Sequence, residues 1–427
     1  MSNERLAKRR RHALGPTYTH FYEKPLYLVR GEGVWLYDDE GRRYLDCYNN
    51  VPSVGHCHPH VVEALTRQVA TLNTHTRYLH HNVVEYAEML GATLPGDLSV
   101  CLFVCTGSEA NDLAYRIARA ATGNEGAICT TGAYHGNTTL VAELSPEYER
   151  KRPPPDFIVD VEPPDRYRCR FPAGDPGFVD HYADLVDDAI DELADRGHRP
   201  AMMIIDSIFD AAGVHTPPAA YQQRVHEKVR AAGGLVVCDE VQSGLTRLGD
   251  HFWGFMDSGV VPDIVTMGKP MGAGHPLAAV VTTPEIAAAF AQETDYFNTF
   301  GGSPVSTAAG KAVLEVVERE HLLANVRRSG EYFIHGLREL AARHALIGDV
   351  RGKGLFIAVE LVDNRDTKQP ARSAAAAVVE SMREQGVLTA LIGRDRNALK
   401  FRPPLVFRKE HADIALAALD TALSAVA

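Results

Sequence analysis

The 427-residue sequence lacks the features of membrane, secreted and nucleic-acid-binding proteins. No apolar run is long enough to span a bilayer, and the N-terminal region has no apolar segment of the signal-peptide type. Positive charge is in deficit, since 44 lysines and arginines stand against 55 aspartates and glutamates and give a net charge of -11. This balance argues against a nucleic-acid or anionic-membrane partner. We expect a cytoplasmic protein.

One short stretch departs from this charge balance. Residues 8–12 read Lys-Arg-Arg-Arg-His, but the run is short and no aromatic residue is interleaved in it. Nucleic-acid-binding segments usually combine such charge with stacking rings. The run therefore predicts the solvated face of an N-terminal helix.

Cysteine is scarce and odd in number, with seven in the chain. Most cysteines lie in apolar runs, where a reduced cysteine behaves as a small hydrophobic side chain. His56, Cys57 and His58 form a metal-like group, but Pro59 follows and no second ligand pair has suitable spacing. The sequence predicts neither a disulfide framework nor a metal site.

The chain is too long for one small core, so several substructures are expected. Residues 1–57 are predicted to form an N-terminal segment, with antiparallel strands near 25–30, 34–37 and 43–46, that packs with a small C-terminal domain. Residues 58–325 are predicted to form the large domain. Residues 326–427 are predicted to form the small α+β domain.

Short apolar strands alternate with helical segments in the large domain, which is typical of an α/β fold. The strands are expected at residues 100–104, 126–130, 202–206, 235–239, 264–267 and 277–281. This pattern predicts a mainly parallel central sheet with helices on both faces, and functional residues at the carboxyl ends of the strands. Residues 146–178 are polar and rich in proline, and are predicted to cross the surface outside the sheet.

Two candidate sites follow the first two of these strands. Residues 106–111 open a helix, where backbone N–H groups, at Gly107 for example, and the hydroxyl of Ser108 can bind phosphate. An ordinary helix cap by Thr106 or Ser108 is the alternative. After the next strand, Tyr134 can stack on a planar cofactor, or it can be a packed tyrosine in a turn.

Two further candidates end the later strands. Asp239 can hold a proton on a ring nitrogen, although a helix-capping aspartate is the alternative. Lys269 lies among glycines and can form a Schiff base, although a turn lysine is the alternative. A phosphate cradle, an aromatic plate, an acid for a ring nitrogen and a lysine together make up a pyridoxal phosphate site.

These residues lie in motifs that resemble the class III aminotransferases, which are pyridoxal phosphate enzymes of fold type I. The motifs are YLD (44–46), GHCHP (55–59), TGSEAN (106–111), YHG (134–136), DEVQSG (239–244), DIVTMGK (263–269) and NTFGG (298–302). The resemblance covers nearly the whole chain. It implies that fold and pyridoxal 5'-phosphate as the cofactor.

By this resemblance Lys269 is the Schiff-base lysine, Asp239 pairs with the pyridine nitrogen, and Tyr134 covers the ring. The other implied cofactor contacts are Gly107, Ser108, His135, Gln242 and Thr299. Thr299 would reach the phosphate of the neighbouring subunit's cofactor, which requires a homodimer with active sites at the subunit interface. Asp206 stands where the family more usually has glutamate.

Several stretches resemble the ethanolamine-phosphate phospho-lyase branch of this family more closely. They are CYNNV (47–51), NTHTRYLH (73–80), GKPMGAGHP (268–276) and LKFRPP (399–404). A phosphorylated amine substrate carries a dianionic group that needs clustered cations. Arg77, Lys400 and Arg402 are the candidates, with surface ion pairing and strand-edge solubility as the alternatives.

The resemblance therefore implies β-elimination of phosphate from O-phosphoethanolamine, with release of an enamine that hydrolyses to acetaldehyde and ammonia. Lys269 would act first as the Schiff base and then as the general base. The alternative is an ω-aminotransferase that moves an amino group from an amine or ω-amino acid to an α-keto acid. A non-catalytic binding protein built on the same fold is the third possibility.

Overall fold

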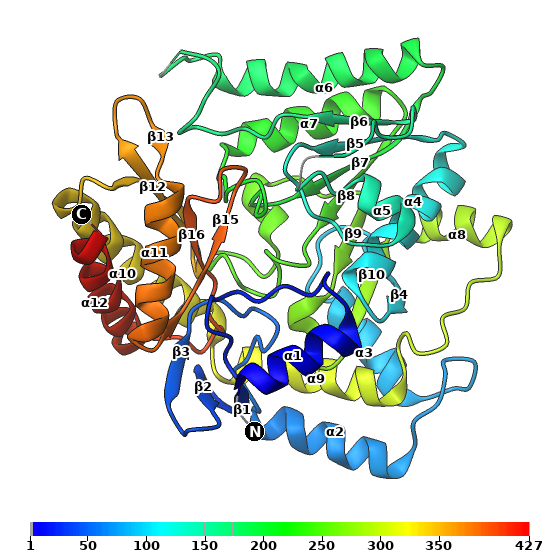
Figure 1. Cartoon of the computed structure of the whole chain (residues 1–427). Helices are drawn as coiled ribbons and strands as arrows, with labels where there is room; N and C mark the ends of the chain where they lie inside the picture. Colours follow the sequence, from blue (N-terminus) through cyan, green and yellow to red (C-terminus); the bar gives the residue numbers. More distant parts are fainter. Residues whose placement is uncertain (1–2, 148–149, 173, 427) are drawn as a thin grey trace.

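A seven-stranded sheet forms the centre of the computed structural model, which describes residues 3–147, 150–172 and 174–426 (Figure 1). Its strands in spatial order are β4 (Val100–Val104), β10 (Ala278–Thr282), β9 (Ile264–Met267), β8 (Leu235–Asp239), β7 (Pro200–Asp206), β5 (Gly126–Thr130) and β6 (Ile158–Val161). β10 is antiparallel to both of its neighbours, and the other pairings are parallel. The predicted mainly parallel sheet is confirmed.

Strand β6 corrects the prediction for residues 146–178. The proline-rich stretch was expected to stay outside the sheet, yet Ile158 and Val159 are buried and β6 pairs with β5 at the sheet edge. The flanking prolines obscured a four-residue apolar strand, which is short enough to be missed by its periodicity. Prolines are tolerated beside an edge strand, because only one side of it must be hydrogen-bonded.

Both faces of the central sheet are buried, as β7 shows most clearly. Met202 and Ile204 pack with residues of α4 (Gly107–Thr122) on one face. Met203 and Ile205 pack on the other face with residues of α6 (Phe178–Asp195) and α7 (Ala219–Ala231). Because every residue of β7 is buried, the strand reads as a continuous apolar run rather than an alternating one.

Two smaller sheets complete the fold. β1 (Leu28–Glu32), β2 (Trp35–Asp38) and β3 (Arg43–Asp46) form the predicted meander, and β14 (Val387–Leu388) joins it parallel to β3. The other sheet contains β11 (Ile347–Lys353), β12 (Phe356–Asn364), β16 (Ala398–Phe401) and β15 (Ala390–Ile392), with β13 (Gln369–Pro370) paired to β12. N-terminal and C-terminal residues therefore share one sheet, while the domain limits at 57/58 and 325/326 stay predictions.

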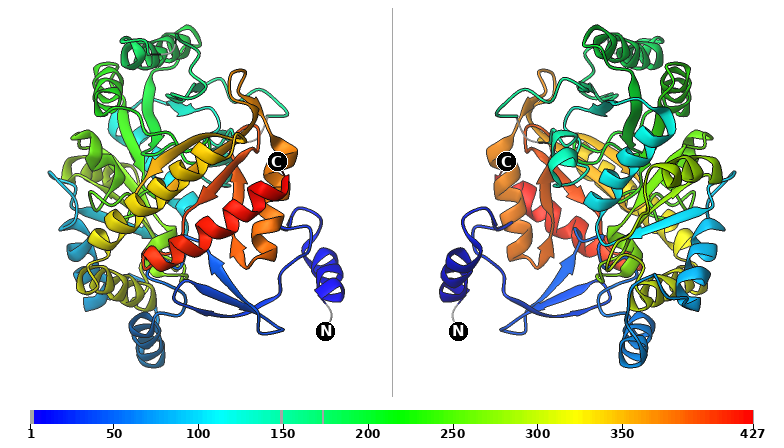
Figure 2. Two further views of the ribbon diagram at one scale, coloured as in Figure 1. Left: turned by 90° about the vertical axis from the view of Figure 1, so that its left-hand side faces the viewer. Right: turned by 90° about the vertical axis from the view of Figure 1, so that its right-hand side faces the viewer.

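The remaining helices lie around these sheets, as the two side views show (Figure 2). They are α1 (Asn3–Leu14), α2 (Pro59–Thr71), α3 (His81–Gly91), α5 (Thr139–Glu143), α8 (Pro284–Glu293), α9 (Pro304–Arg319), α10 (Leu322–Arg343), α11 (Arg372–Glu384) and α12 (Lys409–Val426). Helix α1 has no buried residue and carries the basic run on an exposed surface, as predicted. No helix in the described ranges combines the length and apolarity needed to cross a membrane.

A close backbone contact between α10 and the β11–β12 turn gives a stability prediction. A Cβ atom on Gly330 would overlap the carbonyl oxygen of Gly354, which is backbone and cannot swing away. Gly330→Ala should therefore destabilise the protein by about 1–3 kcal/mol in urea unfolding. Gly91→Ala, at the last residue of α3, is the control, since its Cβ would meet Ser99 only at 3.8 Å. Equal unfolding midpoints for the two variants would contradict this account.

Candidate active site

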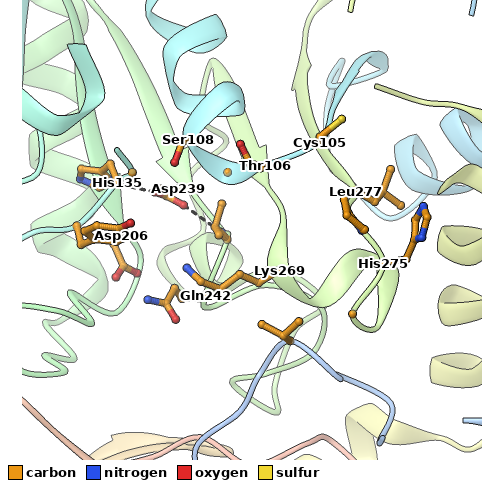
Figure 3. A pocket seen from close by; sticks show the side chains of 17 residues that line it. Cys105, Thr106, Ser108, His135, Asp206, Asp239, Gln242, Lys269, His275 and Leu277 are labelled. Carbon is orange, nitrogen blue, oxygen red and sulfur yellow. Dashed lines mark hydrogen bonds and ion pairs between the residues drawn. The ribbon is translucent and has the colours of Figure 1, made fainter. Parts of the chain in front are cut away.

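A cavity of about 340 Å³ opens at the carboxyl edge of the central sheet (Figure 3). It is lined by Val51, Cys105, Thr106, Gly107, Ser108, Tyr134, His135, Gly136, Asp206, Asp239, Val241, Gln242, Lys269, Gly274, His275, Pro276 and Leu277. Seven of the eight predicted cofactor residues are therefore brought together here, as expected for an α/β sheet. The exception is Thr299.

The start of α4 forms one wall of the cavity. Thr106 caps the helix by accepting the backbone N–H of Glu109 at 3.2 Å, and the Glu109 carboxylate accepts the backbone N–H of Cys105 at 3.0 Å. This reciprocal capping leaves the first backbone N–H groups of the helix, at Gly107 and Ser108, without helical acceptors. An anion in the cavity would meet them and the positive end of the helix dipole.

Close packing against this helix start depends on glycine. Gly136 has φ +144°, and a Cβ there would overlap Ser108. The backbone of residues 134–137 can therefore approach α4, where the Ser108 hydroxyl and the Asn137 side chain lie 3.1 Å apart. This approach holds Tyr134 at the cavity wall, with 40% of its surface exposed.

Asp239 ends β8 on the cavity floor and is 5% exposed. Its Oδ1 accepts the backbone N–H of Val241 at 3.0 Å, and its Oδ2 lies 2.7 Å from Nδ1 of His135. Asn111 also donates to Oδ2, at 2.9 Å. Asn111 was absent from the predicted site residues, although its position four residues after Gly107 puts both on one face of α4.

Lys269 follows β9 and begins the short helix η2 (Lys269–Gly272). The preceding Gly268 approaches α4 closely, because a Cβ there would lie 3.3 Å from the backbone nitrogen of Gly107. Burial lowers the pKa of the Lys269 ammonium, and the nearby Arg402 guanidinium lowers it further. The amine lies 6.0 Å from the ring centroid of Tyr134. A lowered pKa favours the neutral amine, which is the nucleophilic form.

Two further carboxylates stand at the end of β7, and neither was among the predicted site residues. Asp206 accepts the backbone N–H of Ile208 at 3.1 Å and that of Asp210 at 2.7 Å. Burial, with the negative charges of Asp210 and Asp239 nearby, raises the pKa of Asp206 to about 8. Asp210 accepts a hydrogen bond from the Gln242 side chain and so lies directly behind the cavity wall.

Two of the three predicted substrate cations, Lys400 and Arg402, meet at Asp210. Lys400 Nζ lies 2.5 Å from Asp210 Oδ1, and Arg402 Nη1 lies 3.7 Å from Asp210 Oδ2. All three side chains are buried. Burial alone would raise the pKa of Asp210, but the two cations outweigh it and lower that pKa. These cations do not line the cavity itself. Gln242 lines it and donates to Asp210, the carboxylate that both cations face.

Arg77 and Thr299 lie away from this cluster. Both side chains are exposed, and the Arg77 guanidinium lies 4.1 Å from the ring centroid of Phe297, two residues before Thr299. Neither residue lines this chain's cavity. Their predicted roles toward substrate and cofactor stay predictions.

Pyridoxal phosphate fits the donor set of the cavity. Gly107 and Ser108 would hold its phosphate, Asp239 its ring nitrogen, and Lys269 its aldehyde carbon, while Tyr134 supplies an aromatic wall. Gly136 and Gly268 leave room where a side chain would intrude. Among the described residues, no group of three histidines, cysteines or carboxylates could hold a metal ion.

The stability of the site is expected to depend on pH through Asp206. Its pKa rises from the ordinary 3.8 to about 8 on folding, so the folded state keeps a proton that the unfolded state releases. This contribution is full below about pH 4 and is lost as the pH rises through about 8. Asp206→Asn should therefore lose less stability than the parent chain over that range, by at most about 1.4 kcal/mol per pH unit.

Urea unfolding of the cofactor-free protein at several pH values measures this difference. Asp188→Asn, on an exposed position of α6, is the control and should follow the parent chain. An Asp206→Asn variant with the same pH slope as the parent would contradict the prediction.

Comparison with curated proteins identifies relatives of this chain. A Drosophila melanogaster protein named alanine–glyoxylate aminotransferase 2-like is 42% identical over 438 residues, covering 100% of this chain and 88% of that protein. A Caenorhabditis elegans protein named ethanolamine-phosphate phospho-lyase homolog 1 is 38% identical over 439 residues, covering 99% of this chain and 94% of that protein. The curated relatives thus carry both kinds of name.

Solved structures divide in the same way. A phospholyase from Arthrobacter, solved in complex with phosphoethanolamine, matches with a TM-score of 0.95 and 44% identity over 98% of this chain and 99% of that chain. An omega-transaminase from Thermomicrobium roseum matches with a TM-score of 0.89 and 30% identity over 99% of this chain and 98% of that chain. The family model for class-III aminotransferases matches residues 17–423. The chain belongs to the class III aminotransferase family, whose members depend on pyridoxal phosphate and share fold type I.

Proposed function

We propose that this protein is a phospho-lyase that eliminates phosphate from O-phosphoethanolamine and releases an enamine, which water hydrolyses to acetaldehyde and ammonia. The observation that carries the proposal is the buried pair of cations, Lys400 and Arg402, behind the cavity wall. They face one carboxylate, Asp210, so the cluster has a net positive charge. The match to a phospholyase solved with phosphoethanolamine supports the same substrate.

One hydrogen-bond donor of the cation pair is available to bind an anion. Arg402 Nη1 is buried and has no hydrogen-bond partner among the described residues, and its distance of 3.7 Å from Asp210 is too long for a hydrogen bond. The rings of Tyr48 and Phe356 lie 5.2 Å and 5.7 Å from the guanidinium and exclude water from it. A phosphate oxygen would satisfy this donor in a setting where charge-assisted hydrogen bonds are strong.

In this reaction each residue of the site would have a separate role. Bound pyridoxal phosphate supplies an electron sink for the substrate carbon that bears nitrogen. Asp239 keeps the ring nitrogen of the cofactor protonated, and Tyr134 restrains the ring. The neutral amine of Lys269 takes the proton from that carbon. Lys400 and Arg402 hold the phosphate and stabilise the charge that it gains on leaving.

An ω-aminotransferase is the second candidate, because a specific finding favours it. The D. melanogaster relative bears an aminotransferase name, and the T. roseum structure is an omega-transaminase. The same cation pair would then bind the carboxylate of an amino or keto acid. The two candidates share Lys269 and Asp239 and differ in whether the second substrate carbon carries a leaving group.

The proposal includes a homodimer with active sites at the subunit interface. Large apolar side chains are exposed on the two loops that carry Arg77 and Thr299, and Leu79 and Phe300 are 101% and 72% exposed. The contact between Arg77 and Phe297 puts these loops side by side. Exposed apolar groups gathered in this way mark a protein–protein interface. A second copy of the chain would cover them and bring Thr299 to the partner's cofactor phosphate.

Free phosphate measured without any keto acid tests the reaction. The parent protein should release phosphate from phosphoethanolamine, and Lys269→Ala should release none, because it lacks both the cofactor link and the base. Lys400→Met and Arg402→Gln should each raise KM by about tenfold or more. Lys228→Met is the control, because it removes a lysine of α7 that is paired with Asp184 and Asp187 of α6.

No phosphate release by the cofactor-loaded parent would contradict the lyase. Formation of alanine from pyruvate and an amine would favour the aminotransferase instead. Melting curves of each variant separate a binding defect from a folding defect.

Light scattering of the cofactor-loaded protein tests the dimer. The parent should have twice the chain mass, and Leu79→Glu combined with Phe300→Glu should have the mass of one chain, because two charges would be buried at the interface. Ile414→Glu, at an exposed position of α12, should leave the mass unchanged. A parent protein that is monomeric at micromolar concentration would contradict this part of the proposal.

A further inference from the structure

A buried hydrogen-bond network lies beneath Asp239 and extends away from the cavity. Asn111 Nδ2 lies 2.9 Å from Asp239 Oδ2 and 2.7 Å from the carbonyl oxygen of His135. Thr266 Oγ1 lies 2.6 Å from Asn111 Oδ1. Thr266 stands beside Asp239 on the neighbouring strand β9, and both it and Asn111 are fully buried. Neither of these two residues lines the cavity.

The orientation of the Asn111 amide follows from its neighbours. A carbonyl oxygen and an ionised carboxylate can only accept hydrogen bonds, so the nitrogen of the amide must face them. The amide oxygen therefore faces Thr266, whose hydroxyl must donate to it. A single chain of donors leads from Thr266 through Asn111 to Asp239.

This chain makes the two oxygens of Asp239 unequal. Oδ2 accepts from Asn111 and lies 2.7 Å from His135 Nδ1, which must carry a proton to face the carboxylate. These two donors occupy the lone pairs of Oδ2. Oδ1 accepts only the backbone N–H of Val241 among the described residues, at 3.0 Å, and so retains a lone pair.

We propose that Asn111, oriented by Thr266, is a positioning residue that occupies Oδ2 of Asp239 together with His135 and leaves Oδ1 for the ring N–H of the cofactor. The two donors to Oδ2, from Asn111 and from His135, also stabilise the ionised carboxylate, which is the form that keeps the ring nitrogen protonated. The role is the same in an elimination and in a transamination, so it is independent of the proposed lyase activity. Thr266 acts only through Asn111.

A double-mutant cycle on cofactor binding tests this role. Pyridoxal phosphate is titrated into the cofactor-free form of Asn111→Ala, of Thr266→Val, of the double variant and of the parent, and the Kd is measured from absorbance. Asn111→Ala should raise the Kd by about tenfold and Thr266→Val by about threefold. The double variant should match Asn111→Ala, because the Thr266 hydroxyl has no effect without the amide.

Two conservative changes serve as controls in the same assay. Thr266→Ser keeps the hydroxyl and should bind the cofactor as the parent does. Thr282→Val removes an equally buried hydroxyl of the sheet, one that donates to the Asp263 carbonyl oxygen at 2.8 Å, and should leave the Kd unchanged. If Asn111→Ala fails to fold, the comparison of Thr266→Val with Thr266→Ser and Thr282→Val still decides the question.

The pH titration of the bound cofactor's absorbance is the second measurement. Asn111→Ala and Thr266→Val should shift the midpoint of this titration in the same direction, because both substitutions destabilise the ionised carboxylate of Asp239. A purely structural role would lower the melting temperature without moving this midpoint. An unchanged Kd in Asn111→Ala, or a Thr266→Val effect that adds in full to that of Asn111→Ala, would overturn the proposal.

Discussion

Charge compensation in a water-poor space is the constraint on which the site depends. Asp206, Asp210, Asp239, Lys269 and Lys400 gather at one edge of the central sheet, and a buried charge without a partner costs several kcal/mol. Lys400 stabilises the charge of Asp210, while burial and the two nearby carboxylates raise the pKa of Asp206. The pKa values of Asp206, Asp210 and Lys400 therefore depend on burial and on the charges beside them.

The same constraint connects separate parts of the fold. Asp210 follows β7 of the central sheet, whereas Lys400 lies on β16 of the C-terminal sheet. The ion pair between them joins the two sheets behind the cavity wall. Arg402 extends this junction to the N-terminal segment, because its Nε donates to the carbonyl oxygen of Tyr48 at 3.2 Å. Loss of one of these charges would loosen both the packing and the site.

The residues expected to contact the cofactor and those proposed to select the reaction lie in different parts of the fold. Lys269, Asp239 and the start of α4 come from the central sheet, and they suit any member of the family. The groups that would recognise a substrate phosphate are Lys400 on β16 and Arg402 directly after it, and both lie beyond Gln242. A change on β16 could therefore alter the substrate while the cofactor contacts stay intact. This separation is consistent with relatives that bear both aminotransferase and phospho-lyase names.

Much of the fold was predictable because parallel strands buried on both faces form continuous apolar runs, and the residues that follow them meet at one edge. That rule located Ser108, Tyr134, Asp239 and Lys269 from the sequence. Strand β6 was missed, since four apolar residues between prolines carry little periodic signal.

The sequence by itself determined the class of sheet, the family and most of the residues that line the cavity, because these depend on local order along the chain. Only the tertiary structure decided that Asn111 supports Asp239 and that Asp210 pairs with Lys400, 190 residues away in the chain. Such partners share no local pattern. They meet because separate elements converge, and their charges and hydrogen bonds must be satisfied where water is excluded.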